Sequence, residues 1–231
     1  MPDPEFQPGQ PIEDYIIGQR LERGGMGELY LARDVTLKRK VIIKVLCAPF
    51  SQKQEYKNQF LREAKIQANL DNPHVVQVFR AFVHQGVPCL VMQHVEGTDL
   101  EKIVKKATAV REKRREKGAL SAERGIHIFL QVLEGIGFAH KYNIVHGDIK
   151  PSNILLDQQG RVKIVDFGLS FMLASGRKMK GESLPGGTLQ FMSPEQLLNE
   201  DVDSRSDIYS LGVTFFFMLT AQWPTGERKS L

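Results

Sequence analysis

Residues 144–156 read IVHGDIKPSNILL, a polar loop that runs directly into an apolar, strand-like end. The loop carries Asp148, Lys150 and Asn153. A carboxylate can accept the proton of an attacking hydroxyl, a lysine can neutralise charge on a transferred phosphoryl group, and an asparagine can hold a metal ion. These residue types are common on loops, so the stretch needs support from the rest of the chain.

That support comes ten residues further on, from a second carboxylate. Residues 161–165, RVKIV, alternate like a strand and lead into the triplet DFG at 166–168. Oxygen donors at Asn153 and Asp166, on neighbouring hairpin strands, can share magnesium ions that bridge the phosphates of a nucleotide. The two stretches together predict a catalytic and metal centre.

Length and composition indicate a soluble globular protein of one domain or two tightly joined lobes. The chain has 231 residues, of which 42% are hydrophobic and 25% charged, with a net charge of +4. Residues 105–118 hold seven Lys or Arg against two Glu, a local charge of +5, so the remainder sums to −1. Basicity confined to one segment argues against a nucleic-acid or membrane-binding surface. We expect a solvated helix or loop there, with an interaction patch as the alternative.

Cysteine usage and hydropathy favour a reducing, cytoplasmic location. Cys47 and Cys89 each lie in an apolar run, which predicts buried structural thiols rather than a disulfide framework or metal cluster. The first residues lack the apolar core of a signal peptide. The longest apolar tract, 208–221, is about 14 residues and too short to span a membrane. A membrane anchor downstream, in a longer parent protein, stays open.

The N-terminal region predicts a disordered leader and then a glycine-bearing hairpin. Residues 1–12 contain four prolines and few apolar groups. Residues 15–21 and 28–32 look like strands, and the intervening glycines are Gly24, Gly25 and Gly27. Glycines in such a hairpin let backbone N–H groups approach phosphate oxygens. The alternative is an ordinary tight hairpin.

A lysine in the middle of an apolar strand is the next informative feature. Lys44 lies within 40–46, and a buried lysine is costly unless it is paired. Glu63, in the helical segment 53–70, is the natural partner. The alternative places Lys44 on an edge strand, facing solvent.

The remaining pattern divides the chain into a strand-rich and a helix-rich part. Residues 75–82 and 88–92 predict two more strands, and 93–97 a connector. A helix then runs from a Ser121 cap to about residue 140. Its apolar face holds Ile126, Phe129, Leu130, Leu133 and Ile136. A later helix, Val213 to Leu219, is apolar on nearly every side and is predicted to be central.

These motifs together resemble the bacterial serine/threonine protein kinases of eukaryotic type. The match runs in the family's order from about residue 15 to 225, through Gly24, Gly27, Lys44, Glu63, His146, Asp148, Lys150, Asn153, Asp166, Ser193-Pro194-Glu195 and Asp207. The resemblance implies an α+β, bilobal fold. An N-lobe over 13–94 has an antiparallel β-sheet and one main helix, and a mostly helical C-lobe over 95–231 lacks its last helices.

The resemblance also implies a role for each matched residue, with ATP and magnesium (or manganese) as cofactors. Asp148 is the catalytic base, Lys150 steadies the γ-phosphate, and Asn153 and Asp166 bind the metal. Lys44, paired with Glu63, holds the α- and β-phosphates. The remaining nucleotide-binding positions are Leu21, Gly24, Gly25, Gly27, Leu29, Ile42, Met92, Gln93, Val95 and Leu155. Asp148, Asp166 and Lys44 are expected to converge on one cleft.

Several positions depart from the family's pattern. Gly147 replaces the arginine on which an activating phosphate docks. Glu22 replaces the first loop glycine, Ile42 a small alanine above the adenine, and Gln67 an apolar helix residue. The arginine that pairs with Glu195 would lie beyond Leu231, so Glu195 is expected to lack this partner and the second lobe to be aggregation-prone.

The leading hypothesis is an ATP-dependent kinase of protein Ser/Thr hydroxyls, or a truncated piece of one, with a homodimer left open. Lysine two residues after the base, with Gly187-Thr188, favours the Ser/Thr type over the tyrosine type. The first alternative is a pseudokinase that binds nucleotide or protein without turnover. A small-molecule kinase of related fold fits less well, because such enzymes generally lack the Ser-Pro-Glu element.

Overall fold

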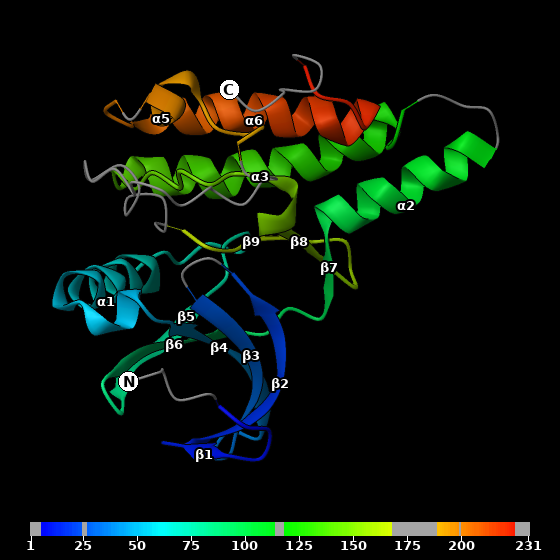
Figure 1. Cartoon of the computed structure of the whole chain (residues 1–231). Helices are drawn as coiled ribbons and strands as arrows, with labels where there is room; N and C mark the ends of the chain where they lie inside the picture. The colour runs from blue at the N-terminus through cyan, green and yellow to red at the C-terminus, as the bar shows by residue number, and fades with distance from the viewer. Residues whose placement is uncertain (1–5, 25–26, 114–117, 168–188, 199, 225–231) are drawn as a thin grey trace. The chain divides into compact units, whose positions relative to one another are not determined.

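Alternating apolar side chains fold the first part of the chain into a six-stranded antiparallel sheet, ordered β1-β2-β3-β4-β6-β5 (Figure 1). One helix, α1, packs against β5 and β6. The elements are β1 (Pro11–Ile12), β2 (Tyr15–Arg23), β3 (Gly27–Asp34), β4 (Arg39–Leu46), the 3-10 turn η1 (Phe50–Gln52), α1 (Gln54–Ala68), β5 (Val78–His84) and β6 (Val87–Gln93).

This computed structural model describes residues 6–24, 27–113, 118–167, 189–198 and 200–224. The chain divides into two compact units. The first comprises residues 1–71 and 76–94, and the second comprises 72–75 and 95–231. The sequence placed a single boundary after residue 94, whereas the structure assigns the short segment 72–75 to the second unit.

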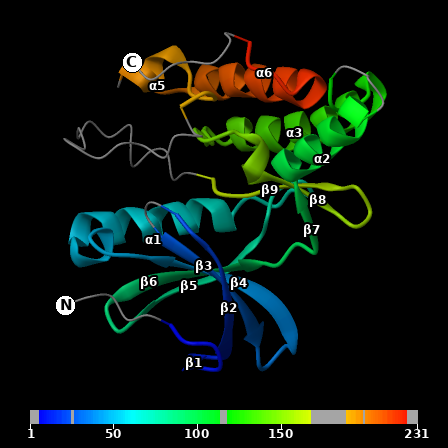
Figure 2. The same ribbon diagram turned by 45° about the vertical axis from the view of Figure 1, so that its right-hand side comes forward.

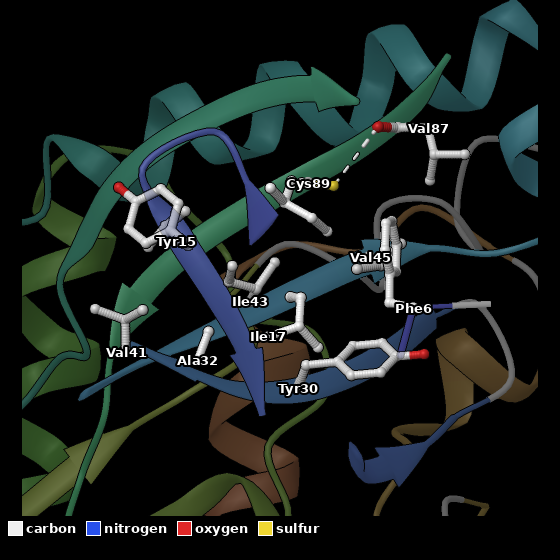
Figure 3. Packing of buried hydrophobic residues seen from close by; sticks show 12 residues of the cluster. Phe6, Tyr15, Ile17, Tyr30, Ala32, Val41, Ile43, Val45, Val87 and Cys89 are labelled. Atoms are coloured by element: carbon white, nitrogen blue, oxygen red, sulfur yellow. Dashed lines mark hydrogen bonds between the residues drawn. The ribbon is translucent and has the colours of Figure 1, made fainter. Parts of the chain in front are cut away.

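The core of the first unit lies on one face of its sheet. Ile17, Tyr30, Ala32 and Ile43 are nearly inaccessible to solvent and gather on this face (Figure 3). Because successive side chains of a strand point to opposite faces, Lys44 lies on the other face from Ile43. The sheet therefore separates its core from the side on which Lys44 stands.

The predicted disorder of the leader is wrong for residues 6–12. Phe6 is 3% exposed, and its ring meets that of Tyr30 edge-on at a centroid distance of 5.7 Å. Ile12 is fully buried, and β1 pairs with β2. Phe6 and Ile12 thus join the buried cluster on the core face of the sheet, which composition alone did not indicate.

Both cysteines belong to the first unit. Cys89 is fully buried, and its thiol lies 3.6 Å from the carbonyl oxygen of Val87 (Figure 3). Burial raises the pKa of the Cys89 thiol to about 12, so this group is a structural thiol. Cys47 is only partly buried, and the expectation of burial is confirmed fully for Cys89 alone.

The second unit combines a small sheet with helices (Figures 1 and 2). The antiparallel sheet has the order β7-β8-β9. Contacts of Phe129 with Phe215 and of His140 with Asp207 show that α3 and α6 run antiparallel, side by side. The elements are β7 (Gly97–Asp99), α2 (Leu100–Lys113), α3 (Ala122–Lys141), the 3-10 turn η2 (Pro151–Asn153), β8 (Ile154–Asp157), β9 (Val162–Ile164), α5 (Pro194–Leu198) and α6 (Ser204–Thr220).

The basic segment begins within α2. Lys105 and Lys106 are exposed, and Lys105 pairs with Glu101 at 2.6 Å, one helical turn away. Up to Lys113 the segment is thus a solvated helix surface. Among the described residues, the helices all fall short of the length and hydropathy needed to cross a bilayer.

The structure corrects the predicted inner face of α3. Ser121 caps the helix as expected, since its hydroxyl accepts the N–H of Arg124 at 3.3 Å. Ile136 is buried as predicted, but the other side chains that enter the core are those of Ile128, Val132 and Ala139. Ile126, Leu130 and Leu133 are exposed. Both stripes have helical periodicity, so periodicity alone could not decide between them.

The exposed apolar stripe predicts self-association. Leu130 on α3 is 59% exposed and Ile208 on α6 is 61% exposed, and a Phe129–Phe215 ring stack joins the two helices. Large apolar side chains exposed on two packed helices favour association. We expect light scattering to show a mass that rises with concentration, and a Leu130→Gln/Ile208→Gln variant to lower it. A constant monomer mass for the unmodified chain would contradict this.

Candidate active site

The loop after α3 brings three of the predicted site residues into contact. Asp148 Oδ2 lies 2.8 Å from Lys150 Nζ. Asn153 Nδ2 donates to the same oxygen at 3.0 Å and to the Asp148 carbonyl oxygen at 2.8 Å. Pro151 opens the short turn η2 and suits its first position, where no backbone N–H is needed. The turn returns Asn153 to Asp148, so a base, a cation and an amide form one cluster.

Asp166 stands beside this cluster because of the β8–β9 hairpin. Ile154 pairs with Ile164, and the N–H of Val165 donates to the Asn153 carbonyl oxygen at 3.0 Å. Asp166 follows directly, with a φ of +62° that L-residues rarely adopt. Gly168, the last residue of the predicted triplet, lies outside the described residues.

His146 ties the loop to the strand that carries Asp166. The imidazole is 1% exposed; its Nδ1 lies 3.2 Å from the N–H of Asp148, and its Nε2 lies 3.0 Å from the Val165 carbonyl oxygen. Since the amide must donate and the carbonyl must accept, the ring is the neutral tautomer with its proton on Nε2. Its centroid lies 4.6 Å from that of Phe167. The sequence marked His146 as a motif residue but gave it no role.

Asp207 anchors the loop from α6. Its carboxylate is fully buried and accepts the N–H groups of His146 at 2.8 Å and Gly147 at 2.7 Å. His140 Nε2 lies 2.7 Å from the same carboxylate. Asp207 was matched to the family's motif without a function, and His140 was missed, because a contact across 67 positions leaves no local pattern.

Gly147 fits its position for a steric reason. Its φ is +69°, in the left-handed region where a side chain is strained and glycine is not. The glycine that replaces the family's arginine therefore relaxes the peptide just before Asp148.

Glu195 has a hydrogen-bond partner other than the arginine that the family resemblance implies. Its carboxylate accepts the hydroxyl of Ser206 on α6. This hydrogen bond lowers the pKa of Glu195. The Ser-Pro-Glu element is therefore linked to α6 within the described part of the chain.

The side-chain oxygens of Asn153 and Asp166 are suitable ligands for a magnesium ion. The Nδ2 group of Asn153 makes both bonds to Asp148, which orients the amide and leaves its oxygen Oδ1 as the remaining ligand atom. Magnesium is typically held by one or two carboxylates together with substrate phosphates, and prefers oxygen ligands. An amide oxygen just before β8 and a carboxylate just after β9 match that set of ligands.

In the first unit, Lys44 lies in the middle of the sheet. Its strand β4 pairs with both β3 and β6, and Lys44 is 9% exposed. The alternative of a solvent-facing edge strand is therefore wrong. Leu29 is its register partner on β3. Ile42 pairs with Met92 on β6, so these four predicted nucleotide-binding residues share one face of the sheet.

The glycine hairpin closes a turn between β2 and β3. The N–H of Gly24 donates to the carbonyl oxygen of Gly27 at 2.8 Å. A Cβ at Gly27 would lie 2.5 Å from the Val45 carbonyl oxygen, so a larger residue does not fit there. Leu21 is 47% exposed on β2. Gly25 lies outside the described residues.

The remaining predicted nucleotide contacts fall in different units. Gln93 ends β6 in the first unit, and its N–H donates to the Gln77 carbonyl oxygen at 2.9 Å. Val95 and Leu155, both partly buried, belong to the second unit.

Glu63 lies on α1, partly buried. Gln59, one turn earlier, donates to Glu63 Oε1 at 3.2 Å. Burial raises the pKa of Glu63 to about 7, although the Gln59 hydrogen bond and the charge of Lys44 act in the opposite direction. Gln67, one turn later, is also buried and donates to the Val76 carbonyl oxygen at 3.5 Å, which gives this unexpected polar residue a partner.

This raised pKa predicts a pH-dependent stability. Between about pH 4.5 and 7 the folded chain binds more protons at Glu63 than the unfolded chain does. The free energy of unfolding therefore falls as pH rises through this window, by at most about 1.4 kcal/mol per pH unit from this group. Glu63→Gln should flatten that slope in urea titrations. Glu55→Gln, an exposed carboxylate change on the same helix, should not; equal slopes for all three proteins would contradict the assignment.

Comparisons with known proteins identify the family. The family described as "Protein kinase domain" matches residues 15–230. The chain is 36% identical over 215 residues to the serine/threonine-protein kinase PknB of Mycolicibacterium smegmatis, covering 91% of this chain and 33% of that protein. It is 35% identical over 226 residues to PknB of Mycobacterium tuberculosis, covering 95% and 34%. The chain thus spans about a third of the length of these curated relatives.

Solved structures support the same fold. The crystal structure of the Mycobacterium tuberculosis PknI kinase domain is similar with a TM-score of 0.73 and 25% identity, over 98% of this chain and 82% of that one. The family match covers nearly the whole sequence. The chain belongs to the protein kinase family.

Proposed function

We propose that this chain transfers the γ-phosphoryl group of ATP to Ser or Thr hydroxyls of proteins, as a signalling kinase. The observation that carries the proposal is the contact of Asp148 with both Lys150 and Asn153. Binding modules do not need a base, a cation and a metal-ligand amide on one loop, whereas phosphoryl transfer uses all three.

Each residue has a distinct part in this chemistry. Asp148 accepts the proton of the attacking hydroxyl, and its contact with Lys150 helps to hold the carboxylate in place. Lys150 neutralises charge on the transferred group. His146 and Asp207 hold the loop peptides and so fix the direction of the Asp148 carboxylate.

In this proposal most of the residues that bind the nucleotide belong to the first unit, and Val95 and Leu155 belong to the second. Lys44 contacts the α- and β-phosphates, and Glu63 orients it. The hairpin of Gly24 and Gly27 offers backbone N–H groups to the phosphates. The apolar positions for adenine are Leu21, Leu29, Ile42 and Met92, with Gln93, Val95 and Leu155.

Asn153 and Asp166 hold the divalent ion. When bound, magnesium or manganese neutralises phosphate charge and orients the transferred group. We place the chain in the cytoplasm, acting on protein substrates.

The test is phosphoryl transfer itself. The chain is incubated with γ-labelled ATP, magnesium and a generic protein acceptor, and the labelled residues are identified. We expect phosphoserine or phosphothreonine, lost when EDTA removes the metal. If ATP raises the melting temperature but no phosphoryl group is transferred, the kinase proposal is overturned and the pseudokinase hypothesis is supported.

Loop phosphorylation is not expected to be required. Gly147 offers no guanidinium on which a phosphate can dock. Alanine at Ser175, Ser183 and Thr188, which lie outside the described residues, should leave kcat within about threefold, or ~0.7 kcal/mol of barrier. A collapse of peptide phosphorylation in this triple variant would refute the prediction.

A further inference from the structure

Gln196 makes an unusual pair of contacts at the start of α5. Its Nε2 group donates to the carbonyl oxygen of Gly147 at 2.6 Å. Its Oε1 accepts the N–H of Ser193 at 3.0 Å. One neutral amide thus joins the Ser-Pro-Glu element to the peptide immediately before Asp148.

The peptide groups of Gly147 are thereby held from two helices. The N–H is held by Asp207 of α6 at 2.7 Å, and the carbonyl is held by Gln196 of α5. A glycine backbone has more freedom than any other, and this one sits at a φ of +69°. Without both anchors, rotation about Gly147 would redirect the carboxylate of Asp148.

We propose that Gln196 is a positioning residue for phosphoryl transfer, whose amide fixes the Gly147 peptide and through it the direction of Asp148. The inference rests on the proposed function, since it concerns the same reaction. The link needs no charge and no modification.

Gln196→Glu separates the two contacts. One carboxylate oxygen still accepts the Ser193 N–H, whereas the other faces the Gly147 carbonyl oxygen, where two acceptors repel. Protonation turns that oxygen into a donor and restores the link. A carboxyl held against a carbonyl is favoured in its protonated form.

The experiment measures kcat and KM of the unmodified chain and of Gln196→Glu over the pH range in which the unmodified chain is active. We expect kcat of the variant to be about 10- to 100-fold lower at the alkaline end, the size of effect that a small misplacement of a catalytic group produces. The KM values for ATP and peptide should stay within about threefold. The ratio of variant to unmodified kcat should then rise as pH falls.

Gln131→Glu is the matched control. Gln131 also joins two backbone groups, accepting the N–H of Val162 at 3.0 Å and donating to the His127 carbonyl oxygen at 3.4 Å. Among the described contacts, Gln131 meets no residue of the loop 144–153 that carries Asp148. The kcat of Gln131→Glu should therefore keep the pH profile of the unmodified chain. If Gln196 merely stabilised the start of α5, Gln196→Glu would behave like this control, and the proposal would fail.

Two further measurements keep the test decisive. If Gln196→Glu does not melt cooperatively, Gln196→Met replaces it in the test. This change keeps the length of the side chain and removes both hydrogen bonds. A lower kcat than that of the unmodified chain supports the proposal, and an unchanged kcat overturns it. Amide hydrogen exchange of residues 146–149 needs no turnover. Faster exchange in Gln196→Met than in the unmodified chain supports the link even if the unmodified chain transfers no phosphoryl group, and unchanged exchange overturns it.

Discussion

Replacing Asp148 with asparagine is expected to lower kcat by about 10²- to 10⁴-fold, the usual contribution of a general base. Asparagine nearly preserves the shape of the side chain and can still meet the amide of Asn153, but it cannot accept the proton of the attacking hydroxyl. It also leaves the ammonium of Lys150, now 2.8 Å from Asp148, without its carboxylate. Nucleotide affinity should change little, because Asp148 does not act on ground-state binding in this mechanism.

Asp157→Asn is the control for this change. Asp157 is a carboxylate on β8 that pairs with Arg161 at 2.7 Å, on the far side of the hairpin from the catalytic loop. Its kcat should match the unmodified chain. The measurement is initial-rate phosphorylation of a peptide at saturating ATP, with the melting temperature of each variant recorded. Retention of more than about a tenth of kcat by Asp148→Asn would remove Asp148 from the role of base.

Asp207→Asn is expected to have the largest effect on stability. The fully buried carboxylate accepts two backbone N–H groups and contacts His140. An amide has only one acceptor oxygen, and its NH₂ group must then face a buried donor. We expect the free energy of unfolding to fall by about 2–4 kcal/mol, the cost of leaving one or two buried donors unsatisfied. The surviving folded protein should also lose kcat, because the loop that carries Asp148 is no longer anchored.

Urea unfolding of Asp207→Asn and of the unmodified chain measures this loss, provided that the slope m is the same for both. Ser121→Ala, which removes the cap of α3, should cost only about 1 kcal/mol and leave kcat intact. If the two variants were equally stable, the carboxylate of Asp207 would not have the anchoring role that its contacts indicate.

Much of the fold was predictable because its signals are local. The apolar run at 40–46 predicted a strand, and the apolar tract at 213–219 predicted a helix, as β4 and α6 show. Asp148, Lys150 and Asn153 lie within six positions of one another, so a single turn brings them together. Their contact could therefore be anticipated from spacing.

The rest of the site depends on distant pairs. Gln196 meets Gly147 across 49 positions and Asp207 meets His146 across 61. No periodicity links such residues, and only the packing of α5 and α6 brings them to the loop. The inner face of α3 was predicted only in part for a related reason. The helix has two apolar stripes, and the elements that pack against α3 decide which stripe is buried.

The buried position of Phe6 has a practical consequence for recombinant work. The family match begins at residue 15, and a protein trimmed to that limit would lose Phe6, Ile12 and the short strand β1. Tyr30 and His84, whose rings lie 5.7 and 6.0 Å from that of Phe6, would then face water. Crystallisation and assay work should therefore retain residues 6–14, because trimming them would expose part of the core of the sheet.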